Sequence, residues 1–183
     1  MRGILNPANL LTLSRVPLAI AFLLVFRTDC QAALWASLGI VVVIELTDLF
    51  DGMLARALGC VSDFGKLVDP FCDSFSRLTV FMVLSTWHLV PLWMTAVLLL
   101  RDLTVSFVRT VASAQGVVIG ARWSGKVKAF VQGPVAIAIV ALVAVAPETA
   151  RELGPWLMLA ASVVTAWSLV DYVWGSREVL AKA

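Results

Sequence analysis

Residues 40–84 of the chain read IVVVIELTDLFDGMLARALGCVSDFGKLVDPFCDSFSRLTVFMVL. This stretch begins and ends with apolar runs, but nine charged side chains lie between positions 45 and 77, and six of them are acidic. Ionisable groups are costly inside an apolar segment, so they indicate a functional site by default. The stretch therefore predicts two neighbouring apolar helices that share a charged site.

The composition of the whole chain indicates a membrane protein. The chain has 183 residues, of which 61% are hydrophobic and 14% are charged, and its mean hydropathy is +0.95. Soluble domains have about 25% charged residues, so this chain has too few charges to cover a surface in water. The formal net charge of +2 gives no indication of a nucleic-acid partner. We expect a polytopic membrane protein in which residues 1–183 form a single domain.

Six apolar segments are separated by short polar breaks. Each is near the ~20 residues that cross a bilayer, and lipid-exposed backbone satisfies its hydrogen bonds within a helix. The predicted fold is all-α with six transmembrane helices. The start signal Asn6-Pro7-Ala8-Asn9 predicts a short N-terminal interfacial helix that runs into the first span. The predicted spans are residues 10–26, 31–58, 64–87, 91–113, 125–146 and 154–174.

Positive charges between these spans fall mainly on one side. Six spans put both termini on the same side of the membrane, whereas the opposite loops contain only Arg27 and Arg151. Because cytoplasmic loops have the excess of Lys and Arg, we expect a multi-pass protein of the cytoplasmic (inner) cell membrane. Both termini and the charged site are then cytoplasmic. The cations on the predicted cytoplasmic side are Arg2, Arg56, Lys66, Arg122, Lys126, Lys128, Arg177 and Lys182.

Four aspartates of the charged stretch have helical spacing. Asp48 and Asp51 are three residues apart near the end of the second span, and Asp69 and Asp73 are four apart near the start of the third. Each pair shares a helix face, and the short connection makes the two helices antiparallel neighbours. Four carboxylates in a medium of low dielectric repel one another, so a cation is required. Oxygen-only ligands favour Mg²⁺ or Mn²⁺, and two such ions are the usual clamp for displacement at phosphorus.

Small residues accompany the aspartates. Gly52 and Ala55 leave the face of the second span uncrowded, and Gly65 does the same on the third. Arg56 can present a two-pronged donor to a phosphate oxygen. Ordinary helix packing would explain each glycine taken singly, but together these residues favour a surface that receives a phosphate-containing ligand.

As a pattern, the stretch is Asp48-x2-Asp51-Gly52-x2-Ala55-Arg56-x8-Gly65-x3-Asp69-x3-Asp73. It resembles the signature of the CDP-alcohol phosphatidyltransferases at all eight fixed positions and at every spacing. The resemblance implies an enzyme of phospholipid biosynthesis, usually a homodimer, which replaces CMP on a CDP-linked lipid such as CDP-diacylglycerol with an alcohol. By the same resemblance, Asp48, Asp51, Asp69 and Asp73 are metal ligands, and Asp73 is also the catalytic base. Gly52, Ala55, Arg56 and Gly65 are then the surface that binds the CDP-lipid.

Cations outside the signature indicate the kind of acceptor. Arg101 and Arg109 are eight residues apart in the fourth span, and Lys126 and Lys128 open the fifth. A group of cations suits an acceptor that itself has a phosphate group. Membrane anchoring and snorkelling of long side chains are the alternative roles for these residues.

Three further stretches, residues 9–15, 101–109 and 123–128, resemble the branch of this family in which the acceptor is sn-glycerol 3-phosphate. That branch usually has a lysine where this chain has Ser74. Arg77, one helical turn from Asp73, is the candidate replacement for this cation. An inositol phosphate is the nearest alternative acceptor, because it also presents a phosphate group.

Two other classes of protein also use acidic residues in membranes. An aspartate-rich membrane prenyltransferase would fit the Asp69-x3-Asp73 spacing alone, but its two acidic motifs lie on well-separated helices. A divalent-cation transporter would place acids along a path near the bilayer midplane, whereas these acids gather at one surface. We keep both as alternatives that the release of CMP distinguishes.

Overall fold

A computed structural model of the chain describes residues 6–57, 63–117, 120 and 122–177, without the side chains of residues 55–57, 63, 66 and 67. Within these residues the secondary structure is entirely helical, in agreement with the predicted all-α class. The helices are α1 (Pro7–Val25), α2 (Gln31–Ala57), α3 (Asp63–Thr86), α4 (Leu92–Ala114), α5 (Trp123–Val145) and α6 (Pro147–Gly175).

The first five helices begin and end within three residues of the predicted spans. At the start of α1, the Asn6 side chain accepts a hydrogen bond of 2.7 Å from the backbone N–H of Asn9. The exception is α6, which begins at Pro147 rather than at residue 154. Proline is well suited to the first position of a helix, because its missing N–H would have no acceptor there. Pro155 then lies inside α6 without ending it.

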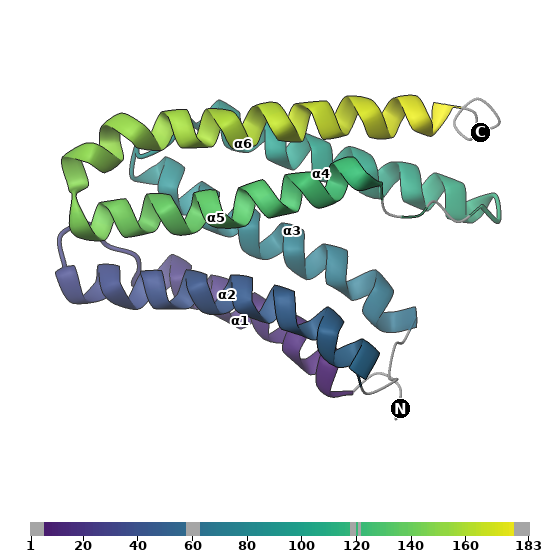
Figure 1. Cartoon of the computed structure of the whole chain (residues 1–183), viewed down its shortest axis with the longest axis horizontal. Coiled ribbons are helices and arrows are strands. Elements are labelled where there is room, and N and C mark those ends of the chain that lie inside the picture. Colours follow the sequence, from purple (N-terminus) through teal and green to yellow (C-terminus); the bar gives the residue numbers. More distant parts are fainter. Residues whose placement is uncertain (1–5, 58–62, 118–119, 121, 178–183) are drawn as a thin grey trace.

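The helices run back and forth along the long axis of the molecule (Figure 1). The start of α1, the end of α2, the start of α3 and the end of α6 lie at the same end of this axis. α1 packs against α2 and α3, while α6 packs against α4 and α5. α3 crosses between these two groups and contacts α4 and α5. α2 also packs against α5, so α2 and α3 together connect the two halves of the bundle.

Among the described residues, four helices are long and apolar enough to cross a membrane, namely α1, α2 as far as Leu54, α5 and α6. Large apolar side chains on their outer faces are exposed, including Leu24 at 75% and Phe130 at 81%. Such surfaces suit a chain that is surrounded by lipid rather than water. The other two helices, α3 and α4, contain several of the charged side chains described below.

The apolar core joins helices from both halves of the bundle. Phe22 of α1, Leu84 of α3, Ile139 of α5 and Met158 of α6 are all fully buried in it. The core residues of α3, such as Leu84, lie in the second half of that helix, whereas Asp69 and Asp73 lie in its first half. The core therefore leaves the charged half of α3 at the end of the bundle where the chain begins.

Candidate active site

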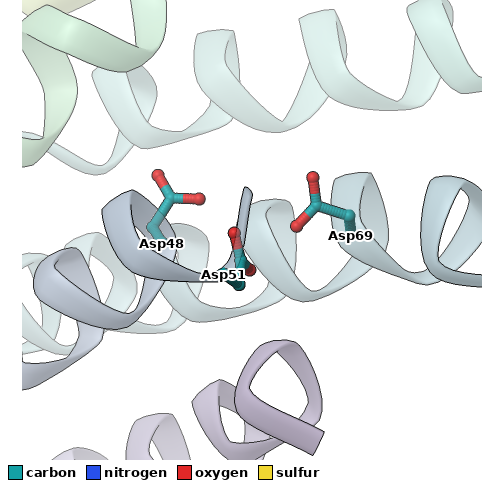
Figure 2. Close-up of side chains that lie close together, drawn as sticks. All are labelled: Asp48, Asp51 and Asp69. Atoms are coloured by element: carbon teal, nitrogen blue, oxygen red, sulfur yellow. The ribbon is translucent and has the colours of Figure 1, made fainter. Parts of the chain in front are cut away.

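Three aspartates meet where the second half of α2 lies beside the first half of α3. One oxygen from each of Asp48, Asp51 and Asp69 lies within 4.8 Å of the others. Figure 2 shows Asp48 and Asp51 on one helix and Asp69 on the next, with the carboxyl groups turned toward a common space. The structure thus brings these three side chains together, as their spacing predicts.

A buried arginine lies at the centre of this group. The Arg15 side chain, from the middle of α1, is fully buried and hydrogen-bonds all four predicted aspartates. Its Nη1 donates to Asp48 at 2.8 Å and to Asp73, while its Nη2 donates to Asp69 at 2.7 Å and to Asp51. Arg15 therefore links Asp73 to the other three carboxylates. We call these four aspartates with Arg15 the acidic cluster.

Arg15 is not among the site residues predicted from the sequence. The sequence does contain a signal that Arg15 belongs to a site, because an arginine in the first apolar segment is as costly as an aspartate in the second. One turn earlier on α1, the Thr12 hydroxyl donates to Asp51 Oδ2 at 2.8 Å. Asp51 is the most buried aspartate of the cluster, with 7% of its side chain exposed. α1 thus forms one wall of the site.

The acidic cluster fits a divalent cation. The atoms of the cluster that could coordinate a metal are all carboxylate oxygens, which hard ions such as Mg²⁺ and Mn²⁺ prefer. A fully buried guanidinium among them shows that the surroundings favour positive charge. The cluster is also accessible, because 45% of the Asp69 side chain and 27% of the Asp48 side chain are exposed. A metal ion can therefore reach the carboxylates from the side of Asp69.

A second arginine contacts the acidic cluster from α3. Arg77 Nη2 donates to Asp48 Oδ2 at 2.6 Å, and its Nε and Nη2 lie 3.4 Å from the two oxygens of Glu45. The Arg77 side chain is only 8% exposed. The sequence makes Arg77 a candidate for binding the acceptor phosphate. In the structure its hydrogen bonds go to carboxylates of α2.

A cluster of the opposite charge balance lies on the other side of α3. Asp102 of α4 accepts hydrogen bonds from Lys128 Nζ at 2.7 Å, from Ser74 Oγ at 2.8 Å and from Arg101 Nη1 at 3.0 Å. Arg101 also donates to Ser168 of α6 at 3.1 Å. Two cations thus share one carboxylate. We call Ser74, Arg101, Asp102 and Lys128 the basic cluster.

Arg101 has donor capacity left in this cluster. Its Nε is buried and has no hydrogen-bond partner among the described residues. Gly125 of α5 makes room for its guanidinium, because a Cβ at this position would lie 3.1 Å from Arg101 Nη2. A buried N–H without a partner is costly, so an anion that accepts from it would be stabilised there.

The other two sequence candidates for the acceptor lie outside this cluster. Arg109 donates from Nε to the Tyr172 hydroxyl at 3.1 Å, and its guanidinium lies 5.8 Å from the centre of the Tyr172 ring. Lys126 is exposed, and its ammonium lies 5.9 Å from the centre of the Trp123 ring. Lys128, two residues further along α5, is the lysine that reaches Asp102.

The residues predicted to bind the CDP-lipid are only partly described. Gly52 follows Asp51 on α2, Gly65 lies one turn before Asp69 on α3, and both are partly buried. Ala55 and Arg56 lie on the last turn of α2, where the side chains are outside the described part of the chain. The glycines thus flank the acidic cluster, and the predicted role of Arg56 stays a prediction.

The fold and the acidic cluster describe a helical protein that has apolar helices of membrane-spanning length and a group of carboxylates that could hold a divalent cation. The profile of the CDP-alcohol phosphatidyltransferase family matches residues 5–167. The chain therefore belongs to the CDP-alcohol phosphatidyltransferase family, and it is an enzyme of phospholipid biosynthesis. The match extends beyond residue 135, where the resemblance found in the sequence ends.

Three curated relatives agree with this assignment. A probable phosphatidylglycerophosphate synthase of Mycobacterium tuberculosis (strain H37Rv) is 36% identical over 176 residues, which are 93% of this chain and 81% of the relative. The CDP-diacylglycerol–glycerol-3-phosphate 3-phosphatidyltransferase of Escherichia coli (strain K12) is 32% identical over 96% of this chain and 97% of the relative. The protein of the same name from Bacillus subtilis (strain 168) is 27% identical over 92% and 95%.

Proposed function

We propose that this chain transfers the phosphatidyl group of CDP-diacylglycerol to a hydroxyl of sn-glycerol 3-phosphate and releases CMP. The observation that carries the proposal is the position of Asp73 and Ser74 on α3. Asp73 joins the acidic cluster through Arg15, whereas Ser74, the next residue, joins the basic cluster through Asp102. An acceptor with a hydroxyl group and a phosphate group matches this pair of clusters. The names of the relatives support the same acceptor.

The acidic cluster is the proposed catalytic centre. Two divalent cations, Mg²⁺ or Mn²⁺, held by Asp48, Asp51, Asp69 and Asp73 would neutralise the charge that grows on the diphosphate. Asp73 accepts the proton of the acceptor hydroxyl, since an alcohol is a poor nucleophile while it keeps its proton. The freed oxygen forms a bond to the lipid-linked phosphorus. The bond from that phosphorus to the bridging oxygen breaks, and CMP leaves with the electron pair.

The CDP-lipid is proposed to bind over the small residues beside the aspartates. Gly52, Ala55 and Gly65 have little or no side chain, so the diphosphate can come close to α2 and α3. Arg56 is proposed to donate to a phosphate oxygen. The acyl chains stay in the bilayer, which accounts for a site built from membrane helices.

The basic cluster is proposed to bind the acceptor phosphate. Arg101 and Lys128 supply more positive charge than Asp102 balances, and the buried Nε of Arg101 is a donor suited to an anion. Lys128 supplies a cation next to Ser74, the residue after the last aspartate of the signature. Arg109 and Lys126 are proposed to add positive potential around this cluster. Arg77 lies on the side of Asp48, where its hydrogen bonds go to Asp48 and Glu45.

The membrane arrangement completes the proposal. We propose that all six helices cross the cytoplasmic membrane, that the first turns of α1 lie at the interface, and that both termini and the site face the cytoplasm. The exposed apolar surface and the Lys and Arg distribution support this arrangement. We further propose that residues 1–183 act as one CDP-alcohol phosphatidyltransferase domain and form a homodimer.

The test is an acceptor panel with the purified protein in detergent. CDP-diacylglycerol is supplied with Mg²⁺ or Mn²⁺ and one of four acceptors, namely glycerol 3-phosphate, inositol phosphate, inositol or serine. We expect CMP release that requires both the metal and glycerol 3-phosphate, together with a product that contains both phosphates. EDTA should abolish the release.

Other outcomes of the panel identify the alternatives. Turnover with inositol phosphate in place of glycerol 3-phosphate would make the chain a phosphatidylinositol-phosphate synthase. No CMP with any acceptor from a folded, metal-binding protein would favour a divalent-cation transporter or an aspartate-rich prenyltransferase. Release of CMP with inositol or serine would contradict the role of the basic cluster.

A further inference from the structure

Asp48 is held at both of its oxygens by different helices. Arg15 of α1 donates to Oδ1 at 2.8 Å, and Arg77 of α3 donates to Oδ2 at 2.6 Å. Arg77 contacts no other aspartate of the acidic cluster in the described interactions. Among the aspartates of the cluster, the Arg77 guanidinium therefore affects the orientation of Asp48 only.

Arg77 is in turn held by Glu45. Glu45 lies one turn before Asp48 on α2, and its two oxygens are 3.4 Å from Nε and Nη2 of Arg77. Both side chains are largely buried, with 17% of Glu45 and 8% of Arg77 exposed. A buried guanidinium needs a partner for its charge, and Glu45 supplies it from the side away from the acidic cluster.

A third helix provides the space for Glu45. Gly133 of α5 is buried against it, and a Cβ at position 133 would lie 2.8 Å from Glu45 Cδ and closer still to Oε2. Any larger residue there would push the carboxylate away from its present position. By contrast, Gly39 on the same helix as Glu45 has no atom within 4 Å of an added Cβ. The close approach at Gly133 is thus a local feature.

We propose that Glu45 and Arg77 are positioning residues for the metal-binding carboxylate of Asp48, and that Gly133 is the niche that keeps Glu45 in place. The inference rests on the proposed metal-binding role of the acidic cluster. Arg77 fixes one oxygen of Asp48 and leaves the carboxylate oriented toward Asp51 and Asp69. Glu45 offsets the charge of Arg77, so that Arg77 does not neutralise Asp48. Neighbours that orient a metal-binding side chain typically change metal affinity or activity by about 10- to 100-fold when they are removed.

The test measures Mn²⁺ binding directly. Free Mn²⁺ is followed by electron paramagnetic resonance as it is titrated with the purified full chain in detergent. We expect Glu45→Gln to weaken Mn²⁺ binding about 10-fold, because Arg77 then pairs more strongly with Asp48. Gly133→Ala should also weaken Mn²⁺ binding, whereas Gly39→Ala should leave Mn²⁺ binding unchanged. In turnover assays, Glu45→Gln should raise the Mn²⁺ concentration for half-maximal rate and leave the KM for CDP-diacylglycerol unchanged.

A double variant tests whether Gly133 acts through Glu45. In the Glu45→Ala background the added methyl of Gly133→Ala meets no carboxylate, so we expect no further loss of Mn²⁺ affinity. A full additional loss would overturn the role of the niche. Mn²⁺ affinities within twofold of wild type for Glu45→Gln and for Gly133→Ala would overturn the whole inference. If Glu45→Gln does not fold, as judged by size-exclusion chromatography, Arg77→Lys and Gly133→Ala decide the question by the same measurement.

The outcome for this inference is separate from that for the proposed function. Wild-type protein that binds Mn²⁺ but releases no CMP would contradict the proposed function, and the variant series would still test the positioning of Asp48. Wild-type protein that releases CMP with glycerol 3-phosphate, combined with unchanged Mn²⁺ binding in every variant, would contradict only the positioning role.

Discussion

The acidic and basic clusters use the same kinds of residues in opposite proportions. In the acidic cluster four carboxylates share the guanidinium of Arg15. In the basic cluster Arg101 and Lys128 share the carboxylate of Asp102. The first therefore retains negative charge for cations, and the second retains positive charge for an anion. The comparison teaches that an excess of one sign, rather than the presence of buried ion pairs, distinguishes a binding site from a structural network.

The largest effect is expected at Asp73, the residue of the acidic cluster that directly precedes Ser74 of the basic cluster. Asp73→Asn keeps the size of the side chain but removes the proton acceptor. We expect turnover to fall about 10³-fold, since positioned general bases contribute about 10²–10⁴-fold. CDP-lipid binding, measured by protection against thermal unfolding, should remain. Equal loss of binding and turnover would show that Asp73 is mainly a ligand.

Next in size is the removal of the counter-ion of the acidic cluster. Arg15→Gln leaves four carboxylates facing one another, and breaking a buried ion pair typically costs about 3–5 kcal/mol. In EDTA we expect the thermal unfolding midpoint to fall by roughly 10 °C, because about 1 kcal/mol shifts a chain of this size by 2–4 °C. Mg²⁺ or Mn²⁺ should restore more of the midpoint in the variant than in wild type. Identical midpoints in EDTA would indicate that the carboxylates do not depend on Arg15.

The basic cluster is tested by comparing two lysines of α5. Lys128→Met removes a cation that we propose binds the acceptor phosphate, and charge-assisted hydrogen bonds are worth about 1.5–3 kcal/mol. We expect the KM for glycerol 3-phosphate to rise about 10- to 100-fold, with little change in the KM for CDP-diacylglycerol. Lys126→Met should give a much smaller rise, because Lys126 is exposed beside Trp123. Similar effects at both positions would mean that α5 contributes only a general positive potential.

The smallest effect is expected at the junction of the clusters. Ser74→Ala removes one neutral hydrogen bond to Asp102, worth about 1 kcal/mol. We expect a change of only a few-fold in the acceptor KM and none in the Mn²⁺ concentration for half-maximal rate. A shift in the metal dependence would show that the two clusters are coupled through α3 rather than independent.

The sequence predicts the helices and the aspartates for local reasons. Apolar runs of suitable length place five of the six helices within three residues. Spacings of three and four residues place Asp48 with Asp51 and Asp69 with Asp73, because both follow from the period of one helix. The short connection between α2 and α3 predicts that the two pairs lie close together. In the structure α1 packs more closely against α2 and α3 than they do against each other, and its Arg15 bonds to all four aspartates.

The partners of the aspartates depend on tertiary packing, which the sequence does not give. No spacing rule relates Arg15 to residues more than 30 positions away, because their contact depends on how α1 lies against α2 and α3. The choice between Lys126 and Lys128 depends in the same way on which face of α5 turns toward Asp102. The partners of Arg77 are another such case, since Glu45 lies on a neighbouring helix.

Consecutive residues on a helix point about 100° apart, so the Asp73–Ser74 pair gives α3 two working faces. On the proposed function, the chemistry of bond transfer lies on one face, and the choice of incoming alcohol lies on the other. On that proposal, substitutions of Arg101 on α4 or Lys128 on α5 would alter which alcohol enters and leave the aspartates of the acidic cluster in place. This separation offers a route to redesigning the lipid product of the enzyme without rebuilding its catalytic chemistry.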